Sequence, residues 1–518
     1  MNINKLAKLD GSSLTLSEIK EIVFNDKKIE IDKKSLKKVK DSFNFLSDYS
    51  QKNVVYGLNT GLGPMAKHFI DDSLISRLQK NLIRSHALGL GGNLPSEFVK
   101  TTLLVRLNTL TKGYSGVDLD VLRILTTLVN KNILPIIPEH GSVGASGDLV
   151  QLAHVALALI GEGEVSHKNK ILKTESVFKK EKIKPLEVKL RDGLAMINGT
   201  STMSSIAAIN LLRADKLYNY ALLSSAFLYE ITQSSATYIS EELSRVRPHK
   251  GQVLVAEKLR NILKSSQLID KQDLSYKVYK ELKTNKNKAD LSTQEIYSIR
   301  CAPQVLGPIF ESIEQAKEVV EIEINSVNDN PVIYSQKGIY HGGNFHGDYI
   351  SFEMDKLKIA ITKLSILSER RLNFLMNDKL NKILPPFVNL GVLGVNFGLQ
   401  GLQFVATSTV AENQTLSNPM SVHSITTNND NQDIVSMGTN SALMTSKVIE
   451  NTFQVLAVEF IAIIQAVDCL GIKNKLSKET QKTYSQMRKI LPVFKGDTLK
   501  TSDINKMIKY LKGDTFSF

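Results

Sequence analysis

The chain has 518 residues, 42% hydrophobic and 23% charged, which is the composition of an ordinary globular protein. The formal net charge is +13, but acidic residues interrupt most lysine-rich stretches and no aromatic residues alternate with them, which argues against a nucleic-acid partner. The two cysteines form no spacing motif, and the first residues do not resemble a signal peptide. No apolar run approaches the roughly 18 residues of a membrane span. These features predict a cytoplasmic protein without a membrane partner.

Apolar residues spaced three and four apart predict a mainly α-helical chain, and strand-like alternation is scarce. Two polar, lysine-rich stretches, 167–191 with strand-like patches and 258–290 with helical character, should lie at the surface. Pro385-Pro386 should interrupt the helical pattern, and Gly471 should end the last helix. In chain order, the strongest predicted helices cover 149–160, 204–228, 309–324, 354–376 and 448–470.

A turn of small residues from Gly141 to Asp148 precedes the first of these helices. A tight loop with Asp148 at the helix N-terminus is the purely structural interpretation. Asp148 stands where a hydrolase nucleophile elbow needs glycine, and a phosphate-binding loop would need a lysine that is absent. A third interpretation is cyclisation, in which the Gly147 amide attacks the Ala145 carbonyl and Ser146 is dehydrated. The product, methylidene-imidazolone, is an electrophile, and a helix N-terminus would favour the negative charge that develops on it.

The run Gly144-Ala145-Ser146-Gly147-Asp148-Leu149 resembles the signature of the histidine, phenylalanine and tyrosine ammonia-lyases, and the resemblance extends from about Tyr56 to Leu470. It implies a long central helical bundle with a smaller N-terminal globular region, of the ammonia-lyase/fumarase type, divided here into 1–110 and 111–518. It also implies a prosthetic group made from Ala145, Ser146 and Gly147 without an external cofactor. Members of this family are homotetramers whose sites combine segments from several subunits.

Further motifs follow in family order, and the resemblance implies a role for each. Tyr56, in a glycine-rich loop, would be the catalytic base, which needs a lowered pKa and so predicts an alkaline activity optimum. Asn198 and Tyr297 would orient the substrate amine and stabilise the adduct. Arg300 would hold the substrate carboxylate through two parallel hydrogen bonds. Taken alone, these motifs would be turns, a packing tyrosine and a surface arginine.

Other positions complete the expected site. Gln294 and Phe345 match family segments that contact the substrate and the electrophile. His341 and His346 lack the helical spacing of a zinc-binding pair and are surrounded by glycines, so no metal is expected.

Two positions bear on the substrate, an aromatic L-amino acid. Ser85-His86 resembles the histidine lyases and argues against phenylalanine, because a phenol or an imidazole could each partner His86. Gln432 stands where histidine lyases carry a glutamate, and an amide loses the charge-assisted bond to an imidazolium. Together with Ser201 after Asn-Gly-Thr, this favours L-tyrosine and the products trans-4-coumarate and ammonia. The alternatives are a histidine ammonia-lyase, an aromatic aminomutase that uses the same electrophile, and a non-enzymatic helical scaffold, which leaves the joint occurrence of the motifs unexplained.

Overall fold

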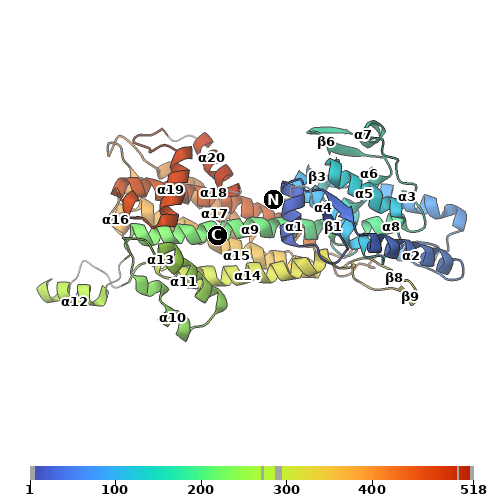
Figure 1. Cartoon of the computed structure of the whole chain (residues 1–518), viewed down its shortest axis with the longest axis horizontal. Coiled ribbons are helices and arrows are strands. Elements are labelled where there is room, and N and C mark those ends of the chain that lie inside the picture. The colour runs from blue at the N-terminus through green and yellow to red at the C-terminus, as the bar shows by residue number, and fades with distance from the viewer. Residues whose placement is uncertain (1–5, 270–273, 286–293, 499–500, 514–518) are drawn as a thin grey trace. The chain divides into compact units, whose positions relative to one another are not determined.

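The computed structural model describes residues 6–269, 274–285, 294–498 and 501–513, and helices dominate it as predicted (Figure 1). The chain divides into two compact units. The first unit consists of Met1–Leu212, Ala316–Asp355 and Pro419–Ser446. The second consists of Arg213–Gln315, Lys356–Asn418 and Lys447–Phe518.

The first unit contains short helices and small sheets. Its helices are α1 (Leu16–Phe24), α2 (Lys33–Ser50), α3 (Ile75–His86), α4 (Ser96–Thr111), α5 (Leu119–Lys131), α6 (Leu149–Leu159), α7 (Thr174–Glu181) and α8 (Asp192–Ile197). Local sequence explains their starts: Thr15 and Glu18 form a capping box at α1, and the Asp32 side chain accepts the Lys34 amide at α2. The boundary predicted after residue 110 falls inside α4, within this unit.

The strands of the first unit pair locally. β1 (Ala7–Leu9) pairs with β2 (Ile29–Ile31) in parallel. The antiparallel pairs are β3 (Leu90–Asn93) with β5 (Pro138–His140), β4 (Leu134–Pro135) with β6 (Glu164–His167), β6 with β7 (Lys170–Lys173), and β8 (Val332–Tyr334) with β9 (Gly338–Tyr340). β7 and the end of β6 confirm the strand-like patches predicted within 167–191, and the residues that follow form α7.

Four long helices contain four of the five boundaries between the units: α9 (Ser201–Ile231), α14 (Ala302–Ile324), α15 (Asp348–Met376) and α18 (Gly438–Leu470). Together with α6 they confirm the five predicted helices, and most begin earlier than periodicity indicated. α18 is long and apolar enough to cross a membrane, but 78% of its most apolar window is buried inside the structure, which is the placement of a core helix.

The second unit is helical apart from its connections in the part that the structure describes. Its shorter helices are α10 (Glu241–Val246), α11 (Lys250–Leu263), α12 (Leu274–Asn285), α13 (Tyr297–Arg300), α16 (Asp378–Asn381), α17 (Gln400–Leu416), α19 (Lys478–Ile490) and α20 (Thr501–Lys512). α11 and α12 agree with the helical character predicted for 258–290, of which 270–273 and 286–290 lie outside the described residues. The break predicted at Pro385-Pro386 is a single 3-10 turn, Pro386–Val388.

Candidate active site

The small-residue turn before α6 is built around a buried carboxylate, Asp148. It stands at the N-cap position of α6 but makes no side-chain cap there. Instead it accepts the Thr202 and Met203 amides of the first turn of α9, at 2.8 and 2.9 Å, together with the hydroxyls of Ser142 and Thr439. Burial raises the pKa of Asp148, and the hydrogen bonds oppose that shift. Asp148 therefore joins the turn to α9 rather than capping its own helix.

Two glycines of the turn are in conformations and contacts that exclude a side chain. Gly147 has φ +69°, and a Cβ there would lie 2.0 Å from the Gly199 carbonyl oxygen. Gly144 has φ +71°, and a Cβ there would lie 2.1 Å from the Ser436 hydroxyl oxygen. The Asp148 amide donates to the same Gly199 carbonyl at 2.7 Å, so the turn and the segment before α9 are in direct contact.

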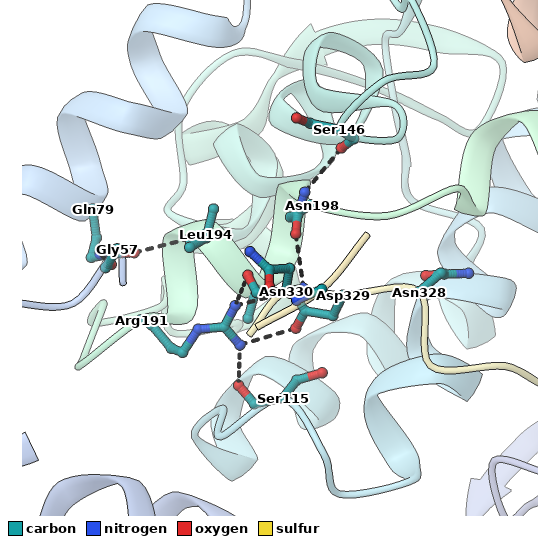
Figure 2. Close-up of polar contacts among 12 residues, drawn as sticks. Gly57, Gln79, Ser115, Ser146, Arg191, Leu194, Asn198, Asn328, Asp329 and Asn330 are labelled. Carbon is teal, nitrogen blue, oxygen red and sulfur yellow. Dashed lines mark hydrogen bonds and ion pairs between the residues drawn. The ribbon is translucent and has the colours of Figure 1, made fainter. Parts of the chain in front are cut away.

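Ser146, at the centre of the turn, is held at two atoms. Gln432 Nε2 donates to the Ser146 hydroxyl at 2.7 Å, and Asn198 Nδ2 donates to the Ser146 carbonyl at 3.0 Å. Asn198 Oδ1 in turn accepts the Asn330 amide at 2.9 Å, so Asn198 lies between Ser146 and Asn330 (Figure 2). Gln432 thus contacts the serine hydroxyl, and its expected contact with the substrate ring stays a prediction.

A cavity of about 670 Å³ opens over Ser146. The side chains of Met65, Ile70, Leu78 and Leu82 give it an apolar wall. An apolar wall with a few converging polar groups suits a small aromatic ligand. The predicted site residues that line it are Tyr56, His86, Ser146, Asn198, Phe345 and Gln432.

The loop that carries Tyr56 is fixed by hydrogen bonds between side chains and the backbone. The Tyr56 hydroxyl accepts the Gly63 amide at 2.9 Å. Buried Gln79 of α3 donates to the Gly57 carbonyl at 2.8 Å and accepts the Leu194 amide of α8 at 2.9 Å (Figure 2). One amide side chain therefore ties the tyrosine loop to the helix that leads to Asn198.

His86 is the last residue of α3, and its Nδ1 contacts two groups of its own helix. Nδ1 lies 2.9 Å from the Leu82 carbonyl oxygen and 3.0 Å from the Ser85 hydroxyl. Because a carbonyl only accepts, a neutral ring that bonds to Leu82 through Nδ1 carries its proton on Nδ1. Nε2 is then a hydrogen-bond acceptor.

Sequence reasoning missed the buried charges behind Asn198. Arg191 donates two hydrogen bonds of 3.0 Å to Asp329 and one of 2.9 Å to the Asn330 carbonyl (Figure 2). Arg106 of α4 donates to the Asn198 carbonyl at 2.9 Å. A signal for Arg106 was present, because a single arginine within Leu103-Leu104-Val105-Arg106-Leu107 must find a buried partner.

These features agree with comparisons with known proteins. The family model described as aromatic amino acid lyase matches residues 14–489. The chain belongs to this family. A histidine ammonia-lyase from Geobacillus sp. (strain WCH70) is 38% identical over 512 residues, covering 98% of this chain and 97% of the relative. A tyrosine 2,3-aminomutase from Chondromyces crocatus is 36% identical over 514 residues, again covering 98% and 97%.

The fold is that of this aromatic amino acid lyase family, as the sequence motifs predicted. The crystal structure of tyrosine aminomutase from Streptomyces globisporus matches with a TM-score of 0.93 and 36% identity, covering 98% of this chain and 97% of that one. The relatives include both lyases and aminomutases, so the comparisons establish the family and leave the reaction and the substrate to be argued from the site.

Three residues that the family motifs singled out belong to the second unit: Gln294, Tyr297 and Arg300. Tyr297 is 71% exposed. The Arg300 guanidinium lies 5.0 Å from the centre of the Tyr297 ring. Arg300 Nε donates to the Glu295 carbonyl at 3.3 Å. They are outside the set of residues that line the cavity over Ser146, and their roles stay predictions.

His346, near the site, has partners within the protein. His346 Nδ1 lies 3.3 Å from an oxygen of Asp348, and its Nε2 lies 3.3 Å from the Ile434 carbonyl. Within the described ranges, no group of three or more His, Cys, Asp or Glu side chains is arranged to hold a metal ion.

Proposed function

We propose that the protein eliminates ammonia from L-tyrosine to give trans-4-coumarate, using a methylidene-imidazolone formed autocatalytically from Ala145, Ser146 and Gly147. The observation that carries the proposal is the convergence of Tyr56, Ser146, Asn198 and His86 on one apolar cavity. Membership of the aromatic amino acid lyase family supports the same chemistry.

The residues at the turn fit this prosthetic group. Gly147 has no side chain to hinder its nitrogen, and its backbone lies against Gly199 where no Cβ would fit. Ser146 presents its hydroxyl to Gln432 and its carbonyl to Asn198, so both of its groups are oriented. Once formed, the group would supply an electrophilic carbon that no standard side chain offers, to which the substrate amine could add.

The side chains in the cavity would carry the remaining steps. Tyr56 would remove the substrate β-proton, and Asn198 would orient the amine. Arg300 would anchor the carboxylate and Tyr297 would act on the amine, supplied by another subunit of a homotetramer. The high exposure of Tyr297 in the single chain supports that assignment, because an exposed side chain is free to enter a neighbour's site.

The preference for tyrosine rests on the acceptor at His86 and the neutral side chain at Gln432. With its proton on Nδ1, His86 offers Nε2 to a phenol hydroxyl at the ring end of the substrate. Gln432 supplies no carboxylate for an imidazolium. The apolar wall of Met65, Ile70 and Leu78 suits a six-membered carbon ring.

A second candidate is aminomutase activity on tyrosine, in which ammonia returns to the β-carbon. It is favoured by the tyrosine 2,3-aminomutase of Chondromyces crocatus, which is 36% identical across nearly all of both chains. Histidine elimination is favoured by Ser85-His86 and by the histidine ammonia-lyase relative.

The test is to incubate the purified protein with L-tyrosine, L-histidine and L-phenylalanine in parallel at mildly alkaline pH, and to separate the products. We expect coumarate to form fastest and Ser146→Ala to form none. Faster urocanate formation would overturn the choice of substrate, and accumulation of β-tyrosine would favour the aminomutase. Elimination retained by Ser146→Ala would contradict the electrophile.

A further inference from the structure

Arg106 is a fully buried cation whose hydrogen-bond acceptors are neutral. Its guanidinium donates from Nη2 to the carbonyls of Ala195 and Asn198, and from Nη1 to Asn328 Oδ1 at 3.3 Å. Asp329, whose charge acts on Arg106, is itself hydrogen-bonded twice by Arg191. Burial lowers the pKa of Arg106 to about 10, so it stays charged at neutral and mildly alkaline pH. Burying a guanidinium without a directly hydrogen-bonded carboxylate costs free energy, so this position calls for an explanation.

The guanidinium lies directly against the backbone that contacts the reactive turn. A Cβ built on Gly199 would lie 2.3 Å from Arg106 Nη1. The same short segment contacts the turn through the Gly199 carbonyl, which accepts the Asp148 amide at 2.7 Å, and through Asn198 Nδ2, which donates to the Ser146 carbonyl at 3.0 Å. Arg106 therefore contacts one side of the segment Asn198-Gly199, and the opposite side of this segment contacts the reactive turn.

We propose that Arg106 is a positioning residue for maturation, which presses Asn198-Gly199 against Ala145-Ser146-Gly147 so that the tripeptide can cyclise. The inference rests on the proposed function, because it concerns the formation of the prosthetic group. Cyclisation is an intramolecular attack, and its rate depends steeply on holding the two reacting atoms close together. A planar guanidinium that donates to several carbonyls at once fixes a backbone better than a flexible ammonium does.

The chemistry of maturation gives Asn198 a second task, which Arg106 supports. Gly147 N forms a bond to the Ala145 carbonyl carbon, and the Ala145 oxygen leaves as water with the amide hydrogens of Gly147 and Ser146. The Ser146 hydroxyl then leaves as a second water with the Ser146 Cα hydrogen. As that hydrogen departs, negative charge develops on the Ser146 carbonyl oxygen, which accepts the Asn198 hydrogen bond. Nothing is oxidised or reduced, and the mature chain is two waters lighter.

The test measures intact mass under denaturing conditions for the wild type, Arg106→Met and Arg106→Lys. Methionine keeps much of the length and loses all donors, whereas lysine keeps the charge and loses the planar set of donors. We expect the wild type to be lighter by two waters, Arg106→Met to keep both waters, and Arg106→Lys to be a mixture. The Lys variant decides the matter if Arg106→Met does not fold, as judged by circular dichroism.

Arg371→Met is the matched control. Arg371 is also fully buried and donates to the Ala221 carbonyl and to Ser224 and Ser225, in the second unit. We expect this variant to lose stability but still to be two waters lighter. Full maturation of folded Arg106→Met and Arg106→Lys would overturn the inference, as would equal failure of Arg371→Met. A wild type that keeps both waters would instead overturn the proposed function itself.

Discussion

Glu323 is a half-buried carboxyl group that supports the segment before α9. The Thr200 hydroxyl and Asn328 Nδ2 both donate to its Oε1. Burial raises the pKa of Glu323 above its usual 4.5, so the folded chain binds this proton more tightly than the unfolded chain does. The contribution of Glu323 to stability is therefore complete below pH 4.5 and is lost as pH rises toward the folded-state pKa.

The variant Glu323→Gln should raise the melting temperature at pH 9 more than at pH 5. Glutamine keeps the Oε1 acceptor for Thr200 and cannot ionise, so the loss of stability at alkaline pH is removed. Thermal melts of both proteins at the two pH values measure the effect. Glu318→Gln, at an exposed position of the same helix, is the control and should change neither melt. An equal gain at both pH values would mean that ionisation of Glu323 is not the cause.

The sequence motifs predicted which side chains line the cavity, but they did not predict the hydrogen bonds that hold those side chains in place. Tyr56, Ser146 and Asn198 were predicted because their local sequences resemble family segments. The contact of Gln432 with the Ser146 hydroxyl joins residues 286 positions apart, and no local pattern encodes such a pairing. Arg106 was overlooked because a charged residue in a helix is usually solvated, and its burial depends on packing of the whole unit.

At the scale of elements, periodicity predicted the long helices and underestimated their N-terminal ends. α14 begins at Ala302 and continues through Pro308, whereas the predicted helix began after that proline. α18 begins at Gly438, ten positions before the predicted start, and its first turns contain polar residues such as Thr439, whose hydroxyl donates to Asp148. Apolar periodicity cannot detect the first turns of a helix when their residues are polar because they form part of the site.

The hydrogen bond from Gln79 of α3 to the loop that carries Tyr56 can be tested by substitution. Gln79→Leu removes the donor to the Gly57 carbonyl and the acceptor for the Leu194 amide. The loop should then hold Tyr56 less well, and kcat should fall by about 10- to 100-fold, because small misplacements of a catalytic group cost that much. The intact mass should still be two waters below the sequence mass, since Gln79 makes no hydrogen bond to the turn among those described.

The control for this variant is Gln481→Leu. Gln481 also donates to a backbone carbonyl, that of Lys473, but it belongs to the second unit and to α19. Its kcat should equal that of the wild type. An unchanged kcat for folded Gln79→Leu would show that the tyrosine loop does not depend on this amide.

At the scale of the whole molecule, the reactive turn is completed by segments far along the chain. The Gly144 carbonyl accepts the Gly347 amide at 3.0 Å and the Ser436 hydroxyl at 2.9 Å. Gln432 binds the Ser146 hydroxyl from the same late segment. Contacts of this sequence separation form only when most of the first unit has folded. Maturation should therefore follow folding of nearly the whole chain.

A chain truncated after Asn418 should keep both waters, because it lacks Gln432, Ser436 and α18. Intact mass under denaturing conditions measures this even if the truncated chain is insoluble. A chain truncated after Thr498 loses α20 but keeps every contact to the turn, and it should be two waters lighter. If the shorter chain also lost both waters, the tripeptide would cyclise from local geometry alone. The contacts from Gln432 and Ser436 would then serve only to hold the finished group. The close approach of Gly199 to Gly147 would be sufficient for cyclisation.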